Sequence, residues 1–178
     1  MSGHPSSAHG HIINATFGVF DQTTPWIDRR ELPWTELAIQ LTAHAIGRKE
    51  GSCIVPALFK GTERKKEDAE RIDLVMLDSD SGATMDEIST ALRGLGWAAV
   101  VSSTWSHLTF KAKMSRKVFD KWLSETGRSD TDSSAAEAFL RHRGMLPKIA
   151  AGATRTGTDE QFAYFQHGPC PKFRIALP

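Results

Sequence analysis

The sequence predicts a single domain that mixes helices and strands, in the α+β class. Short apolar runs that end at turn residues are typical of buried strands, and several are present. Other stretches carry apolar residues at helical spacing. The order strand, helix, strand across residues 74–101 indicates a βαβ-like unit in one sheet. With 178 residues, the chain suits one compact domain.

The composition is that of an ordinary soluble protein, with 40% hydrophobic and 24% charged residues. A net charge of +1 shows no strongly basic surface in the totals, although charge can be segregated locally. No apolar run approaches the ~20 residues that span a bilayer, and the N-terminus lacks the pattern of a signal peptide. Cys53 and Cys170 form neither a disulfide framework nor a metal-binding pair. We therefore expect a cytoplasmic protein without a membrane partner.

The first part of the chain predicts a leader followed by a helix. Residues 1–32 are expected to form a partly disordered leader, and residues 33–178 the domain. Pro33 and Glu36 favour a helix start, because proline suits the first turn and glutamate the positive end of the helix dipole. We expect this helix to end near residues 44–47.

Two strands are predicted next, and the second one carries the candidate chemistry. Residues 52–59 predict a strand at a sheet edge or with a bulge, since Pro56 lies within it. The apolar run 74–77 predicts a buried strand that leads into Asp78 and Asp80. Residues two apart in a strand point the same way, so these carboxylates emerge side by side and repel each other. A cation such as Mg²⁺ or Mn²⁺ relieves that repulsion, whereas a solvated turn is the alternative interpretation.

A helix follows the aspartates. Thr84 is a plausible N-cap, and Glu87 lies three residues later, at the spacing of a capping box. Gly96 predicts the helix end, and residues 97–101 predict another strand. One apolar stripe is expected to be core: Ile88, Ala91, Leu92 and Leu95.

Polar residues that include Ser106 and His107 follow this strand. The carboxyl ends of parallel strands meet at one edge of a sheet, where open sheets bind ligands. We therefore expect His107 near Asp78 and Asp80, where a histidine can donate to a phosphate or bind a metal. A purely structural histidine is the alternative.

Residues 108–160 predict a helical insertion, with helices over 115–126 and 133–143. Residues 161–166 and 172–177 are candidate strands. Basic residues among aromatics favour a nucleic-acid-binding face, and the alternative is the solvated outer face of two ordinary helices. These basic residues are Lys111, Lys113, Arg116, Lys117, Lys121, Arg128, Arg141, Arg143 and Lys148.

Four segments together resemble the archaeo-eukaryotic primase superfamily, specifically the primase-polymerase domains of plasmids, phages and integrated elements. VMLDSDSG at 75–82 resembles the first motif of that family, and VVSSTWSH at 100–107 resembles its second motif. PKFRIALP at 171–178 is similar to the arginine-bearing strand that follows in many members. The helix and strand between residues 34 and 59 resemble the usual lead-in.

The resemblance implies a central sheet flanked by helices and template-directed nucleotidyl transfer from NTPs or dNTPs. It implies that Asp78, Asp80 and His107 are catalytic, and that Asp78 and Asp80 hold Mg²⁺ or Mn²⁺. It implies that Ser106, His107 and Arg174 bind the nucleotide, with His107 on its phosphates. Single-stranded or primed DNA and a helicase domain or protein are the implied partners.

The sequence departs from the family in one respect that bears on activity. Members usually carry a third carboxylate on a later strand, and this chain ends before it, so we expect a fragment of a longer protein or a cut-down one. A haloacid-dehalogenase-like phosphohydrolase stays open as an alternative, with Asp78 as nucleophile and Asp80 as general acid/base. Against it, Gly82 stands where that family prefers Thr or Val. A catalytically incomplete nucleic-acid-binding fragment is the other alternative.

Overall fold

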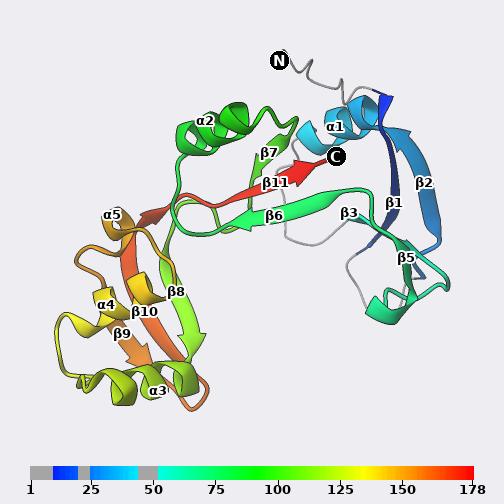
Figure 1. The fold of residues 1–178 in the computed structure, drawn as a ribbon. Helices are drawn as coiled ribbons and strands as arrows, with labels where there is room; N and C mark the ends of the chain where they lie inside the picture. Colours follow the sequence, from blue (N-terminus) through cyan, green and yellow to red (C-terminus); the bar gives the residue numbers. More distant parts are fainter. Residues whose placement is uncertain (1–9, 20–24, 44–51) are drawn as a thin grey trace. The chain divides into compact units, whose positions relative to one another are not determined.

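The computed structural model describes residues 10–19, 25–43 and 52–178, and it confirms a mixed α+β fold (Figure 1). Instead of the single domain predicted over 33–178, the chain forms two compact units. The first unit contains the described residues up to 78, together with 88–105 and 174–178. The second unit contains residues 79–87 and 106–173.

The first unit begins with an antiparallel sheet in the order β2-β1-β3, made of Ile12–Val19 (β1), Asp28–Pro33 (β2) and Ser52–Val55 (β3). Residues 12–19 and 28–32 of the predicted leader therefore form strands of this sheet, while residues 1–9 and 20–24 lie outside the described residues. Both faces of β1 are buried, because Asn14 and Thr16 are buried as well as the apolar residues. Asn14 donates to the Asp73 carboxylate at 2.6 Å and Thr16 to the Ala57 carbonyl at 2.7 Å.

A second sheet of the same unit has the order β6-β11-β7, from Val75–Ser79 (β6), Phe173–Leu177 (β11) and Val100–Ser103 (β7). The arrows of β6 and β11 point in opposite directions in Figure 1. The two predicted strands of the βαβ-like unit thus share a sheet, with β11 between them. Helix α1 (Trp34–Thr42) joins this core and ends before residues 44–47, which lie outside the described residues. The buried core residues are Ile13, Ala15, Trp34, Leu37, Leu74 and Ala176.

The predicted strand 52–59 is interrupted at Pro56, as its proline indicated. Residues beyond β3 continue as β4 (Leu58–Phe59), which pairs with β5 (Ala69–Arg71) in a small antiparallel ladder. A short 3₁₀ helix (Lys66–Asp68) precedes β5.

Helix α2 (Met85–Leu95) begins and ends as the sequence predicts. The Thr84 amide donates to Glu87 Oε2 at 2.7 Å, and the Glu87 amide donates to Thr84 Oγ1 at 3.2 Å, which is a capping box. Gly96 has φ +67°, and the amides of Gly96 and Trp97 donate to the carbonyls of Arg93 and Leu92, which is a Schellman ending. The expected apolar stripe is only partly core: Ile88 is buried, whereas Ala91 and Leu95 are exposed.

The second unit corrects the predicted helical insertion, because it also contains a sheet. Strands β8 (Thr109–Ser115), β10 (Phe162–Cys170) and β9 (Thr154–Thr158) pair antiparallel in the order β8-β10-β9. Lysines alternate with Ala112 and Met114 in β8, so its weak apolar pattern hid the strand.

Three helices complete the second unit: α3 (Arg116–Thr126), α4 (Ala135–His142) and α5 (Pro147–Ala150). The predicted helices over 115–126 and 133–143 are thus present with slightly shorter bounds. Phe119, Phe139 and Phe165 are at most 1% exposed and pack with ring centroids 4.8 to 5.5 Å apart. This core is separate from that of the first unit.

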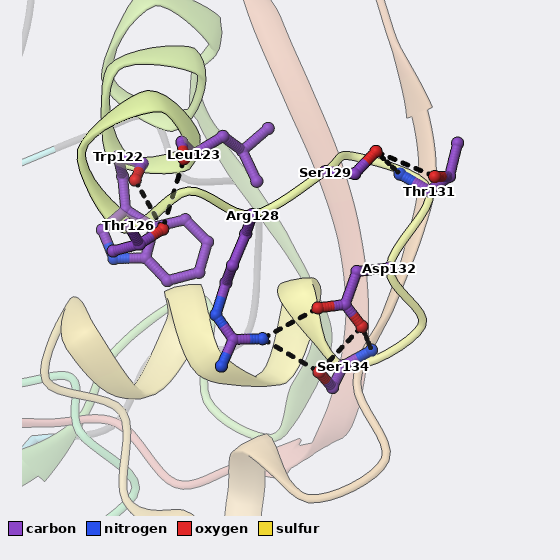
Figure 2. A network of polar contacts seen from close by, with 8 residues as sticks. All are labelled: Trp122, Leu123, Thr126, Arg128, Ser129, Thr131, Asp132 and Ser134. Atoms are coloured by element: carbon purple, nitrogen blue, oxygen red, sulfur yellow. Dashed lines mark hydrogen bonds and ion pairs between the residues drawn. The ribbon is translucent and has the colours of Figure 1, made fainter.

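The connection between α3 and α4 is held by polar contacts (Figure 2). Thr126 Oγ1 donates to the Trp122 carbonyl at 2.8 Å, and Gly127 ends α3 with φ +64°. Arg128 donates to Asp132 at 2.9 Å and to Ser134 at 3.0 Å, and the Ser134 amide donates back to Asp132. These bonds fix the loop that positions the start of α4.

Within the described part of the chain, no helix is both long enough and apolar enough to cross a membrane.

Candidate functional site

Asp78 and Arg174 form an ion pair on neighbouring strands of the first unit. Arg174 Nε and a terminal nitrogen donate to the two oxygens of Asp78 at 2.8 and 3.0 Å, so the pair is bidentate. The side chains are 47% and 52% exposed, so both reach solvent. The hydrogen bonds from Arg174 lower the pKa of Asp78, which is opposed by its slight burial. Asp78 is therefore ionised at neutral pH and accessible.

The sheet β6-β11-β7 gathers the strands of the three segments singled out from the sequence. Asp78 lies on β6, Arg174 on β11, and β7 leads into Ser106 and His107. These strands are separated by up to about a hundred residues along the chain, yet each is hydrogen-bonded to a neighbour in one sheet. The sequence predicted the strands, but their order in the sheet is a finding of the structure.

Asp80, Ser106 and His107 belong to the second unit. The Lys172 amide donates to His107 Nδ1 at 3.1 Å, and the ring packs against Phe173 with centroids 4.8 Å apart. The Lys172 carbonyl also lies 3.0 Å from Nδ1, so this nitrogen contacts both polar groups of the Lys172 backbone. His107 therefore has a ring that is held by its neighbours through Nδ1 and the ring face.

The turn that carries Ser106 and His107 is held tightly. The Ser106 carbonyl accepts hydrogen bonds from the Thr109 amide at 3.2 Å and from Thr109 Oγ1 at 2.8 Å. Leu108 has φ +59°, which is unusual for a residue with a branched side chain, and its amide donates to the Cys170 carbonyl. A strained residue persists only where its surroundings hold it, and such residues cluster at functional sites.

The turn after Asp80 is anchored within the second unit. Gly82 has φ +97°, and a Cβ at this position would lie 2.4 Å from Ile149 Cγ1, so only glycine fits. The Ser81 carbonyl accepts a hydrogen bond from the Leu146 amide at 2.8 Å. The buried Cys170 thiol donates to the Asp80 carbonyl at 3.5 Å, and burial raises the pKa of this thiol. Asp80 is thus presented from a fixed backbone.

Asp78 and Asp80 are both exposed, and their carboxylates are of the kind that Mg²⁺ accepts as ligands. Across residues 10–19, 25–43 and 52–178, no group of three His, Cys, Asp or Glu residues is arranged to hold a metal ion. Mg²⁺ is usually bound by one or two carboxylates, with waters and substrate phosphates as the other ligands.

The sequence missed Lys172 and Phe173 as supports of His107. Neither residue carries a recognisable motif, and their role depends on a backbone amide and on ring packing. Only the return of the chain beside the turn at 106–109 brings them there.

Comparisons with protein-family models, curated proteins and solved structures each gave no significant match.

Proposed function

We propose that this chain is a nucleotidyltransferase domain of the primase-polymerase kind, which acts in the cytoplasm on the replication of a mobile element such as a plasmid or phage. One observation carries the proposal. The three segments that resemble the family's motifs provide the three strands of a single sheet, in the order β6-β11-β7. The resemblance rests on sequence motifs alone. The pairing of these three strands in one sheet is therefore separate support for the proposal.

Each candidate residue has a distinct role in this proposal. Asp78 and Asp80 are the metal-binding carboxylates; bound Mg²⁺ or Mn²⁺ supplies activation of the attacking 3′ oxygen and charge neutralisation of the leaving pyrophosphate. Arg174 holds Asp78 ionised and in place, and its guanidinium is suited to bidentate contact with a phosphate. His107 contacts a phosphate oxygen of the nucleotide, beside Ser106.

A primer-extension assay tests this function. We expect templated incorporation of NTPs or dNTPs with Mn²⁺ or Mg²⁺, and at least a hundredfold loss in the variant Asp78→Ala, Asp80→Ala. Asp86→Asn, an exposed carboxylate outside the aspartate pair, is the matched control and should keep activity. Incorporation that survives the double substitution would refute the roles of Asp78 and Asp80.

The phosphohydrolase alternative gives Asp78 a different role, that of a nucleophile that becomes covalently phosphorylated. We expect no covalent phosphorylation of Asp78 with acetyl phosphate or p-nitrophenyl phosphate, which mass spectrometry of the trapped protein would reveal.

A second candidate function, binding of single-stranded nucleic acid, is favoured by one face of the sheet β8-β10-β9. Ala112, Met114 and Phe165 face the core, so the alternating residues of β8 and β10 form the opposite face. That face combines cations with aromatic rings, through Lys111, Lys113, Phe162, Tyr164 and Gln166.

The rings on this face are held rigidly. Lys113 Nζ lies 3.6 Å from the centroid of the Phe162 ring, and the Tyr164 hydroxyl donates to Asp159 Oδ2 at 2.6 Å. Aromatic rings that stack bases, with cations beside them for phosphates, are the means by which proteins hold single strands. The Asp159 charge opposes a phosphate, but it is bonded by Tyr164 and by two backbone amides.

Fluorescence anisotropy with a labelled oligo-dT tests this second function. Tyr164→Ala should weaken binding by about 1–3 kcal/mol if one base stacks on the ring. Lys111→Gln with Lys113→Gln should lower affinity and the salt dependence, whereas Lys117→Gln with Lys121→Gln, two exposed cations of α3, should not. An equal loss of affinity in both double-lysine variants would refute the proposal that this face binds single-stranded nucleic acid.

A further inference from the structure

The second unit contains a charged hollow that shares Asp80 with the proposed metal site and is otherwise lined by residues to which the functions above assign no side-chain role. Its volume is about 170 Å³. At the roughly 30 Å³ that a water molecule occupies in the liquid, this is space for a small oxyanion with some of its water. Strands β8 and β10, the end of α4 and the segment after it supply the walls. The lining residues are Asp80, Ala112, Met114, Leu140, Arg143, Met145, His167 and Lys172.

His167 is a buried imidazole with an unmet polar atom. The residue is only 7% exposed, and its Nε2 has no hydrogen-bond partner among the described residues. Its Nδ1 lies 2.6 Å from the Gly168 carbonyl, which only accepts, so Nδ1 carries a hydrogen. Nε2 is left to accept from a P–OH group, or to donate when the ring is charged. Buried polar atoms are rarely left unpaired, so a water, an ion or a ligand that reaches this nitrogen would satisfy it.

Two cations line the same hollow. Neither Arg143 nor Lys172 has a carboxylate within ion-pair distance in the described part of the chain, unlike most other arginines there. Asp80 is the only acidic side chain of the lining, so the positive charges outnumber the negative one. A guanidinium, an ammonium and an imidazole together match the oxygens of a phosphate.

We propose that this hollow binds a phosphate oxyanion through Arg143, Lys172 and His167. Ala112, Met114 and Leu140 form the apolar part of the lining, while the exposed Arg143 and the half-buried Lys172 supply the charges. Two sources supply this chemistry: free inorganic pyrophosphate or phosphate, and the phosphate tail of a nucleoside triphosphate. The second source rests on the proposed nucleotidyl transfer, and the first does not.

Calorimetric titration of the full chain with inorganic pyrophosphate, phosphate and ATP, each in EDTA, tests the site. We expect saturable binding of pyrophosphate and at least a tenfold loss of affinity in Arg143→Gln with Lys172→Gln. Arg141→Gln is the matched control, because Arg141 lies two residues away on α4 and does not line the hollow. It should bind within twofold of the wild type.

Three results would overturn the proposal: no saturable binding of any of the three anions, unchanged affinity in the Arg143, Lys172 double variant, or an equal loss in Arg141→Gln. Thermal unfolding of each variant shows whether it is folded. A second readout needs no substitution: the Nε2 resonance of His167 should shift on addition of pyrophosphate, while that of the exposed His142 should not. An unshifted His167 would exclude this ring as a ligand.

The outcomes of these experiments distinguish the oxyanion site from the proposed nucleotidyl transfer. Pyrophosphate binding that persists in Asp78→Ala, in a chain that does not extend primers, would leave the oxyanion site standing while nucleotidyl transfer fails. Primer extension that is intact in Arg143→Gln with Lys172→Gln, together with lost pyrophosphate binding, would assign the hollow to free anions. Tighter ATP than pyrophosphate binding, lost in the same double variant, would assign it to the nucleotide tail.

Discussion

At the scale of single residues, the Asp78–Arg174 pair sets the charge state of the candidate metal-binding carboxylate. Arg174→Gln removes the hydrogen bonds that lower the pKa of Asp78, so this pKa should rise toward its ordinary value. A carbon-detected NMR titration of the Asp78 carboxyl measures the change. Arg71→Gln, which removes a guanidinium that is bonded to Asp73 instead, is the control and should leave Asp78 unaltered. An unchanged Asp78 in Arg174→Gln would contradict the pairing.

Glu87 gives a pH-dependent prediction at the same scale. Hydrogen bonds from Lys148 and from Thr84 lower the pKa of Glu87 from 4.5 to about 2. Because the pKa is lower in the folded state, this stabilisation is complete above about pH 4.5 and is lost as the pH falls toward 2. Urea unfolding of wild type and Glu87→Gln should differ most above that range and converge near its lower end. A difference in unfolding free energy between the two proteins that stays constant down to about pH 2 would contradict this prediction.

The sequence predicted individual residues well where their role is local. Thr84, Glu87 and Gly96 act within a few residues of their own position, so spacing alone located them. His167 was missed because its burial, and the lack of a partner for Nε2, depend on packing between distant segments.

At the scale of elements, the turn after β6 depends on a glycine. Gly82→Ala places a Cβ against Ile149 and forces a left-handed φ on alanine, so we expect a loss of about 1–3 kcal/mol of stability. Gly94→Ala is the matched control: it lies inside α2 with open space around it, and should raise stability by roughly 0.5–1 kcal/mol. Denaturant unfolding measures both, and a neutral Gly82→Ala would refute the close approach.

Strands were harder to predict than helices in this chain. Buried Asn14 and Thr16 break the apolar pattern of β1, because hydrogen bonds to Asp73 and Ala57 satisfy them inside the core. In β8, Lys111 and Lys113 lie on the open face and mask the alternation. Helices α2 and α3 carry local caps or clear apolar faces, which a sequence displays directly.

At the scale of the whole molecule, the described residues form two cores instead of one. Phe139 is fully buried in the core of the second unit and Leu37 in that of the first. Phe139→Ala should cost about 3–5 kcal/mol and Leu37→Ala about 2–5 kcal/mol. Hydrogen exchange should accelerate most in β10 for the first variant and in β1 for the second. Equal acceleration of both strands in both variants would show one cooperative unit.

The division into two units was not visible in the sequence. Each unit is built from segments that are far apart in the chain. Three of the four crossings fall inside β6, α2 and β11, where the sequence shows no linker, and the fourth lies between β7 and β8. Periodicity identifies elements, whereas their grouping depends on which apolar faces meet.

The central claim is that Asp78 and Asp80 hold a divalent ion for a nucleotide, and Mn²⁺ binding followed by electron paramagnetic resonance tests it most directly. The wild-type chain should bind Mn²⁺ more tightly when a nucleoside triphosphate is present. Asp78→Ala with Asp80→Ala should weaken this binding at least tenfold, and Asp86→Asn should not. Equal Mn²⁺ binding by the wild type and the double variant, with nucleotide present, would contradict the claim.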